Sequence, residues 1–296
     1  MTAVDTSAGS VVAAIDVGTN TTRLLVARIT DGVQSPIAHG STMTALGEGV
    51  GATGRIRADA LEFAEHTVAA MAREARELGA GRMVVACTAV ARNAANADEL
   101  LNALQRATGV RPRVLSGEEE AGLTFRGLMT TGMPDRFVAA DLGGGSLELM
   151  GGDGGTLEWV TSLPIGVRSM TERHRPGDPP ALDVTGPMVD EALEQVGPVA
   201  QLHPATAVVA TGGSASALAT LAGTDRLDRA GLLHAAERLA GAAAADIAAE
   251  TGLEPARIRM CLAGAAVLEA VRRAFDVEAL QVSQAGIREG LVAETV

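Results

Sequence analysis

The N-terminal part of the chain contains three short apolar runs separated by turn residues. Residues 11–16 and 22–29 are rich in Val, Ile and Leu, and a Gly-Thr-Asn turn separates them, which predicts two strands. The dipeptide Asp31-Gly32 is a strong hairpin signal and leads into a third strand at 33–38. The pattern therefore predicts that the chain opens as an antiparallel meander.

Strand and helix patterns alternate after this meander. Apolar residues recur at helical spacing over 58–78, and Gly79 ends that run, as glycine often ends helices. The segments that follow are a strand at 82–86, a helix at 97–107, a strand at 113–115 and a helix at 118–129. Because such alternation needs crossover connections, it predicts an α/β fold with a partly parallel sheet.

The second half of the chain repeats this order. Its expected elements are strands at 137–142, 146–151 and 156–162, then helices, a strand at 206–211, helices from 229 to 274 and a strand at 279–282. The Pro- and Gly-rich stretch at 175–187 falls after the second meander, so we interpret it as a surface loop. The repeat favours two domains, with a boundary near 116–117.

The two meanders also share polar residues at one fixed spacing. Each of the following pairs is 125 residues apart: Asp16 and Asp141, Gly18 and Gly143, Thr21 and Ser146, Arg23 and Glu148. A single aspartate after a strand is usually a turn residue, because its side chain bonds nearby backbone amides. Two copies of the same strand, aspartate, glycine turn, hydroxyl and strand indicate an internal duplication instead.

Both turns have the composition of an anion-binding loop. Their glycines can adopt positive φ and leave backbone amides pointing into a concavity, to which hydroxyl groups add further donors. The candidate phosphate-binding residues are Gly18, Thr19, Asn20, Thr21 and Arg23 in the first turn and Gly143, Gly144, Gly145 and Ser146 in the second. A third turn, with Gly213 and Ser214, is either a further phosphate contact or an ordinary strand-to-helix connection with Ser214 as N-cap.

An aspartate at the mouth of a phosphate loop cannot bind phosphate itself, because like charges repel. Its useful role is to hold Mg²⁺, a hard cation bound by one or two carboxylates together with water and phosphate oxygens. Asp141 and Glu148 form the best candidate pair if the hairpin folds sharply, and Asp16 holds the matching position in the first repeat. The histidines form no zinc motif, so zinc hydrolysis is not expected.

The acidic triplet in SGEEE, residues 118–120, and Arg92 each admit two interpretations. Acids in the first turn of a helix are favoured by its dipole, yet one of the three can face a cleft as a general base. Loop arginines are mostly solvated, but all 24 basic residues are arginine, so phosphate charge must be met by arginines such as Arg92, Arg23 and Arg168.

Composition excludes several classes of function. Without lysine there is no Walker phosphate loop and no Schiff-base chemistry. The net charge of −12 argues against a broad nucleic-acid or membrane surface. Residues 1–10 are small and polar, with no signal-peptide pattern, and the two cysteines have no metal or disulfide spacing. We therefore expect a cytoplasmic protein with buried cysteines.

The motifs resemble, in order and over essentially the whole chain, those of the exopolyphosphatase / guanosine pentaphosphate phosphohydrolase family. They are IDVGTNTTRLLV, LGEGV, SGEEEAGLTFRGL, DLGGGSLEL, SLPIGVRSMTER and VSQAGIREGL. The resemblance implies two ribonuclease-H-like domains of the actin-like ATPase superfamily around a cleft. Domain I would span 1–117, with a C-terminal helix at 283–296 packing back on it, and domain II would span 118–282.

The resemblance also implies roles for particular residues. Glu120 would activate water, Asp141 with Glu148 would bind Mg²⁺, and Arg92 falls where the family keeps an arginine. The turns at 18–21 and 143–146 fall where it keeps phosphate loops. Two departures are Thr19 and Thr21 in place of the commoner serine, and Arg259 in place of an aspartate that many members carry.

The expected function is Mg²⁺-dependent removal of terminal phosphate from inorganic polyphosphate. The same chemistry on guanosine pentaphosphate is the main alternative. A small-molecule kinase of the same superfamily and a non-enzymatic guanosine-phosphate sensor are further alternatives, and a homodimer is possible. Phosphate release without an acceptor would separate a hydrolase from a kinase and a sensor.

Overall fold

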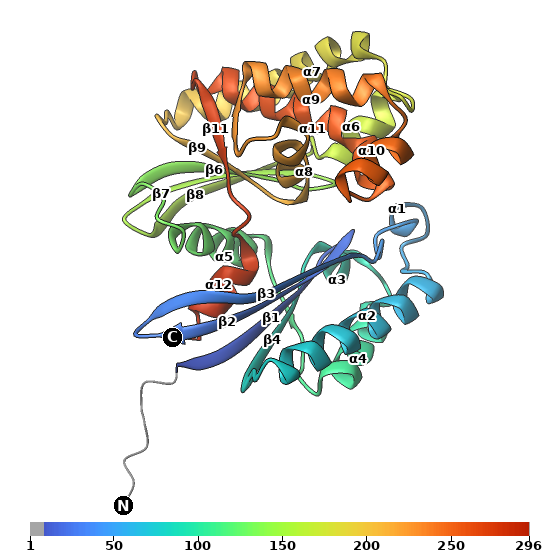
Figure 1. Ribbon diagram of the computed structural model, residues 1–296, viewed down its shortest axis with the longest axis vertical. Coiled ribbons are helices and arrows are strands. Elements are labelled where there is room, and N and C mark those ends of the chain that lie inside the picture. Colours follow the sequence, from blue (N-terminus) through green and yellow to red (C-terminus); the bar gives the residue numbers. More distant parts are fainter. Residues whose placement is uncertain (1–8, 296) are drawn as a thin grey trace, which may run out of the picture. The chain divides into compact units, whose positions relative to one another are not determined.

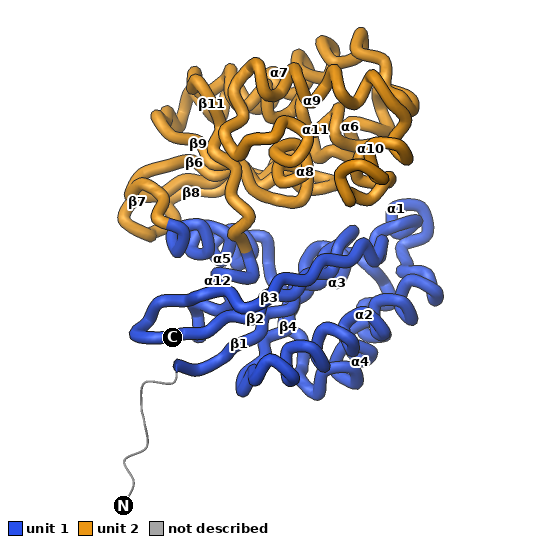
Figure 2. Tube along the Cα trace, in the orientation of Figure 1, with its two compact units in different colours: residues 1–131, 287–296 blue, residues 132–286 orange. Residues whose placement is uncertain are grey.

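The apolar runs of the sequence form two β-sheets, one in each of two α/β units (Figures 1 and 2). The structure is a computed structural model and describes residues 9–295. Unit 1 comprises Met1–Thr131 and Ile287–Val296, and unit 2 comprises Gly132–Gly286. The chain thus leaves unit 1, builds unit 2 and returns to finish unit 1.

Unit 1 contains a five-stranded sheet in the order β3-β2-β1-β4-β5. Its strands are β1 Ser10–Val17, β2 Thr21–Thr30, β3 Val33–Met43, β4 Arg82–Cys87 and β5 Arg113–Val114. The first three form the expected antiparallel meander, and β4 and β5 run parallel to β1. Asp31 and Gly32 join β2 to β3 with φ of 52° and 78°, the left-handed values that a tight hairpin turn needs.

Helices cover both faces of this sheet. They are α1 Val50–Thr53, α2 Ala58–Glu77, α3 Ala89–Asn93, α4 Ala97–Thr108, α5 Gly117–Met129 and α12 Ile287–Ala293. Alternate residues of β1 point to opposite faces, so Ile15 packs with α2 and α4 while Val12 packs with Leu123 of α5 and Leu291 of α12. The face covered by α5 and α12 is therefore the one toward which Asp16 projects.

Unit 2 repeats this plan with a six-stranded sheet in the order β10-β11-β9-β6-β7-β8. Its strands are β6 Arg136–Leu142, β7 Leu147–Asp153, β8 Thr156–Leu163, β9 Val208–Thr211, β10 Arg226–Asp228 and β11 Ala279–Val282. Its α-helices are α6 Val167–His174, α7 Thr185–Leu202, α8 Gly213–Ala222, α9 Arg229–Gly241, α10 Ala244–Thr251 and α11 Pro255–Ala274. Among residues 9–295 no helix is long and apolar enough to cross a membrane.

Several details differ from the sequence-based expectations. The division between units falls after Thr131 rather than at 117, because α5 packs on α12 and so belongs to unit 1. The returning helix spans Ile287–Ala293 and is shorter than the expected 283–296. Of the segment at 1–10, in which no signal pattern was found, residues 1–8 lie outside the described part of the chain.

The two cysteines are core residues, as expected, and give a direct test of the packing. Cys87 and Cys261 are 0% and 1% exposed, and burial raises the pKa of each thiol to about 12. Since only a thiolate attacks thiol reagents, neither should react at mildly alkaline pH in the native protein, and both should react in denaturant. Counting modified thiols by mass spectrometry checks this, and rapid labelling of either one in native protein would contradict it.

Candidate active site

The internal duplication is visible in the backbone of the two glycine turns. The amide of Gly18 donates to the carbonyl of Thr21 at 3.1 Å, and the amide of Gly143 donates to the carbonyl of Ser146 at 3.0 Å. Each turn therefore closes with the same hydrogen bond at the same place in its meander.

The carbonyl oxygens of the second turn, residues 143–146, are held by the start of α6. Those of Gly143 and Gly144 accept from the amides of Val167 at 3.0 Å and Arg168 at 2.8 Å, and that of Gly145 accepts from the amide of Gly166 at 3.3 Å. In a trans peptide the N–H points opposite to the preceding carbonyl. The amides of residues 144–146 are consequently turned away from α6, the arrangement that an anion-binding loop requires.

Gly166 is a structural requirement of this loop that the sequence motifs did not reveal. A Cβ atom at this position would collide with the backbone of Gly144, Gly145 and Ser146.

We predict that Gly166→Ala displaces the loop and lowers kcat/KM by about 10²-fold, the usual effect of a misplaced binding group. Steady-state kinetics would measure this. Gly186→Ala in α7, where a Cβ meets nothing within 4 Å, is the matched control. Equal kinetics for the two variants would contradict the prediction.

The first turn, residues 18–21, is held in a similar way by the segment that follows β3. The amide of Gly47 donates to the carbonyl of Thr19 at 2.7 Å, and the amide of Ala45 donates to the carbonyl of Asn20 at 3.0 Å. A Cβ at Gly47 would collide with the Thr19 methyl group. The LGEG motif at 46–49 and the LPIG motif at 163–166 thus have the same structural role: backbone amides in or next to each motif bond the carbonyls of a glycine turn.

The third turn lies against the second within unit 2. Strand β9 runs parallel to β6, with Thr211 beside Asp141. Gly212 has a φ of 95°, and a Cβ there would lie 2.8 Å from Asp141 Oδ1. Gly212 is the N-cap of α8, so the alternative that Ser214 caps the helix is wrong: Ser214 is buried in the first turn of α8, one residue after Gly213.

Asp141 and Glu148 stand directly opposite each other on the antiparallel strands β6 and β7. Directly opposed residues project from the same face with Cβ atoms about 5 Å apart, so the hairpin is as sharp as the metal hypothesis required. Two carboxylates so placed repel each other unless a cation lies between them. Ser162 donates to Glu148 Oε1 at 2.8 Å and orients that carboxylate. Oxygen donors on one or two carboxylates are what Mg²⁺ takes from proteins, so the pair fits this ion.

Asp16 occupies the matching position in unit 1, but its cross-strand partner is a cation. Arg23 stands opposite Asp16 on β2. Asp16 is 7% exposed, and no donor among residues 9–295 is hydrogen-bonded to its Oδ1 atom. Burial raises the pKa of Asp16, while the charges of Arg23 and Arg288 act in the opposite direction. Among the described residues no group of three or more acidic, His or Cys side chains is arranged to hold a metal.

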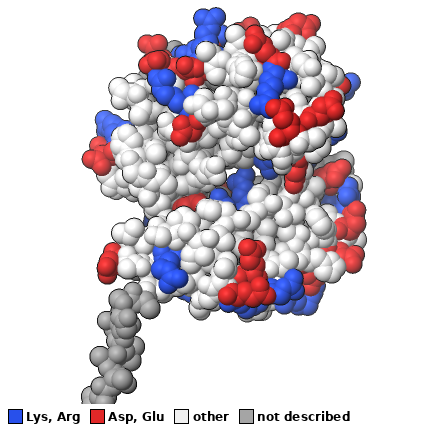
Figure 3. Space-filling view, in the orientation of Figure 1, with Lys and Arg blue, Asp and Glu red and all other residues white. Residues whose placement is uncertain are grey.

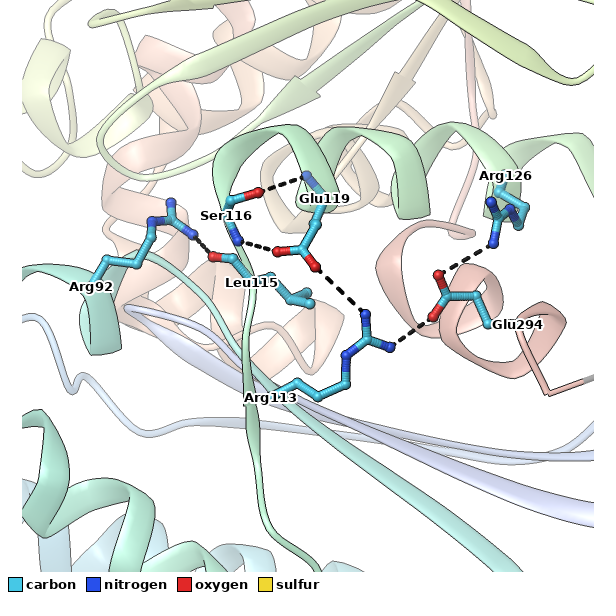
Figure 4. A network of polar contacts seen from close by, with 7 residues as sticks. All are labelled: Arg92, Arg113, Leu115, Ser116, Glu119, Arg126 and Glu294. Atoms are coloured by element: carbon cyan, nitrogen blue, oxygen red, sulfur yellow. Dashed lines mark hydrogen bonds and ion pairs between the residues drawn. The ribbon is translucent and has the colours of Figure 1, made fainter.

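Glu120 lies in the first turn of α5, where the three successive acids have different surroundings. Ser116 and Glu119 form a reciprocal capping box, in which Glu119 Oε2 accepts from the Ser116 amide at 2.8 Å (Figure 4). Glu119 therefore caps the helix, and Glu118 is exposed. Glu120 is partly buried, with 26% of its side chain exposed, and Arg92 Nη1 donates to its Oε2 at 2.6 Å.

Arg92 is held on the last turn of α3, not in a loop as the sequence suggested. Its guanidinium points toward the Leu115 carbonyl (Figure 4), to which Nη1 donates. The sequence suggested Arg92 and Glu120 separately, and the structure places the Arg92 guanidinium beside the Glu120 carboxylate. Arg259, the departure from the family pattern, instead pairs with Asp178 at 3.0 Å and anchors the loop before α7.

Comparisons with known proteins agree with this geometry. A sequence model of the Ppx/GppA phosphatase family matches residues 25–296. Exopolyphosphatase 1 of Mycobacterium leprae is 30% identical, in an alignment that covers 94% of this chain and 87% of that protein. The crystal structure of the Aquifex aeolicus Ppx/GppA family member has a TM-score of 0.81 at 26% identity and 97% coverage of both chains. An exopolyphosphatase structure from Cytophaga hutchinsonii, at 23% identity and a TM-score of 0.85, shows the same fold.

The fold consists of two α/β units, each with a glycine turn next to an acidic residue. Together with the exopolyphosphatase relatives and the family match, this identifies the protein as a phosphoanhydride hydrolase. The chain belongs to the Ppx/GppA phosphatase family. Its activity is accordingly that of an exopolyphosphatase or of a guanosine pentaphosphate phosphohydrolase.

Proposed function

We propose that this chain is a Mg²⁺-dependent exopolyphosphatase, which releases terminal orthophosphate from inorganic polyphosphate. The observation that carries the proposal is the β6–β7 hairpin, where opposed carboxylates of Asp141 and Glu148 adjoin a turn whose amides face away from α6. On such a surface Mg²⁺ binds the two carboxylates while a phosphate accepts hydrogen bonds from the amides of the turn. The cation offsets the repulsion between the carboxylates and the phosphate. The relative from Mycobacterium leprae supports polyphosphate as the substrate.

The proposed mechanism is in-line attack of water on the terminal phosphorus, with cleavage of the bridging P–O bond and departure of the shortened polyphosphate on the opposite side. Glu120 accepts a proton from the water, and Arg92 orients that carboxylate while carrying charge for the phosphate oxygens. The two glycine turns and Ser214 bind phosphate oxygens with backbone amides and hydroxyl groups. Asp141 and Glu148 would hold Mg²⁺, and the ion would supply positive charge to neutralise the phosphoryl oxygens. Asp16 is the corresponding candidate ligand in unit 1.

Phosphate release from polyphosphate, with Mg²⁺ and no phosphate acceptor, tests this function. We expect orthophosphate to accumulate with each turnover, whereas a kinase or a non-catalytic sensor would release none. Guanosine pentaphosphate is assayed in parallel, because the family name covers both substrates. A kcat/KM for guanosine pentaphosphate well above that for polyphosphate would transfer the proposal to the nucleotide.

This enzyme should prefer short polyphosphate chains. A long polyphosphate gains affinity only where basic surface follows it, and that gain is salt-dependent. The chain has 24 basic and 36 acidic residues, and acidic and basic side chains are interspersed on the face shown in Figure 3. We expect a preference for short polyphosphate and distributive release, so that kcat/KM does not rise from tens to hundreds of phosphate units and products of intermediate length appear. Kinetics on size-fractionated polyphosphate would measure this, and a steep rise with length would contradict it.

A further inference from the structure

Arg288, on the helix α12 that returns to unit 1, is a buried cation for which the sequence suggested no role. Only 11% of its side chain is exposed. Its Nη1 donates at 3.2 Å to the carbonyl of Leu24, which lies 264 residues earlier in the chain. Leu24 follows Arg23 on β2, so the guanidinium reaches the strand that begins at the first phosphate turn.

Arg288 shares this buried region with three other charged groups. Asp16 and Arg23 face each other across β1 and β2, and their charges and that of Arg288 act on one another. Glu289 is 6% exposed, and its Oε1 lies 3.6 Å from Arg288 Nη2. Two carboxylates and two guanidinium groups therefore balance in charge at one place.

The cost of burial indicates what Arg288 does there. A buried charge is strongly destabilising unless an opposite charge compensates it. Helix α12 covers the face of the sheet toward which Asp16 projects, and Arg288 bonds the backbone next to Arg23, the cross-strand partner of Asp16. The Oδ1 atom of Asp16 has no hydrogen bond from any residue within 9–295. The fixed cations Arg23 and Arg288 are then what offset the burial of this carboxylate and hold it in one place.

We propose that Arg288 is a positioning residue for Asp16, which makes the C-terminal helix a working part of the first phosphate turn. The catalytic consequence rests on the proposed function: Asp16 presents its carboxylate at the turn 18–21 only while Arg288 holds it. The coupling between Arg288 and Asp16 is a property of the folded protein and exists without substrate or metal.

A second anchor of the same helix provides a control for mere docking. Glu294, just after α12, pairs with Arg113 at 2.7 Å and with Arg126 at 3.3 Å (Figure 4). Gly290 packs so closely on Leu123 that a Cβ would collide with the carbonyl of that residue. Arg126→Met therefore weakens the attachment of the helix without touching Asp16.

A double-mutant cycle read by thermal unfolding without Mg²⁺ tests the proposal. Arg288→Met should lower Tm by roughly 5–10 °C, because it leaves a single guanidinium, that of Arg23, beside the two buried carboxylates of Asp16 and Glu289. In an Asp16→Asn background the same substitution should cost clearly less. Arg126→Met should cost the same in both backgrounds. An equal loss of Tm from Arg288→Met in both backgrounds would overturn the proposal.

The conservative variant and kinetics complete the test. Arg288→Lys keeps the charge but not the planar fork, so its loss of Tm should be smaller, and it replaces Arg288→Met in the cycle if the latter does not fold. Arg288→Met and Asp16→Asn should lower kcat/KM to a similar extent, and the double variant should be no worse than either. Additive losses would overturn the positioning role. The unfolding cycle can be measured even if the protein hydrolyses neither polyphosphate nor guanosine pentaphosphate. A failure of the proposed function can therefore be distinguished from a failure of the positioning role of Arg288.

Discussion

Replacing Glu120 by glutamine is expected to lower kcat by about 10²–10⁴-fold, which is the usual contribution of a positioned general base. The amide cannot accept the proton of the attacking water, but its oxygen can still accept the hydrogen bond from Arg92. The local structure should therefore persist. KM should stay near that of the wild type, because the glycine turns are unchanged.

Glu118→Gln is the matched control for this substitution. Glu118 belongs to the same helical turn and the same acidic triplet, but it is exposed. Its turnover should equal that of the wild-type protein. If Glu120→Gln also retained near-normal turnover, the base would have to be another residue.

Replacing Asp141 by asparagine is expected to raise the Mg²⁺ concentration for half-maximal activity on the order of 10–100-fold. A neutral amide is a poorer ligand for a hard cation, and Glu148 would be left as the single charged donor of the hairpin. Phosphate release measured over a series of Mg²⁺ concentrations gives the shift.

Asp153→Asn provides the comparison for the metal titration. Asp153 lies at the far end of β7, opposite Arg136, and so combines the same residue type with a site away from the turn. Its titration should match that of the wild type. A curve for Asp141→Asn that overlaid the wild-type curve would place the metal elsewhere.

The parts of the fold that could be predicted from sequence are those with local or repeated signals. Strand and helix periodicity located the two meanders, since alternation and turn residues are short-range. The constant offset of 125 residues between matching residues of the two meanders predicted equivalent hairpins. The equivalent hydrogen bonds of Gly18 and Gly143 confirm this prediction. Asp141 and Glu148 could be paired because two antiparallel strands joined by a short turn fix their register.

The remaining features depend on contacts between distant segments. The boundary at 117 was wrong because α5 acquires its packing partner only when α12 returns at Ile287. Gly166 and Gly47 could not be assigned a role, since nothing near them in sequence shows which backbone they touch.

The partners of several charged side chains also lie in distant segments of the chain. The ion pair between Arg92 and Glu120 spans 28 residues, and the bond from Arg288 to Leu24 spans 264. A sequence can mark such residues as unusual in type or motif. Their partners, and hence their physical roles, become apparent only once the two segments lie side by side.

In the proposed reaction, water is the acceptor of a phosphoryl group taken from polyphosphate. The most direct test is hydrolysis of polyphosphate in water labelled with heavy oxygen, with the orthophosphate analysed by mass spectrometry. Attack of water on the terminal phosphorus predicts one labelled oxygen in each phosphate released, at a rate that falls with Glu120→Gln. Orthophosphate released without label, or transfer of phosphate only when another acceptor is added, would contradict the account.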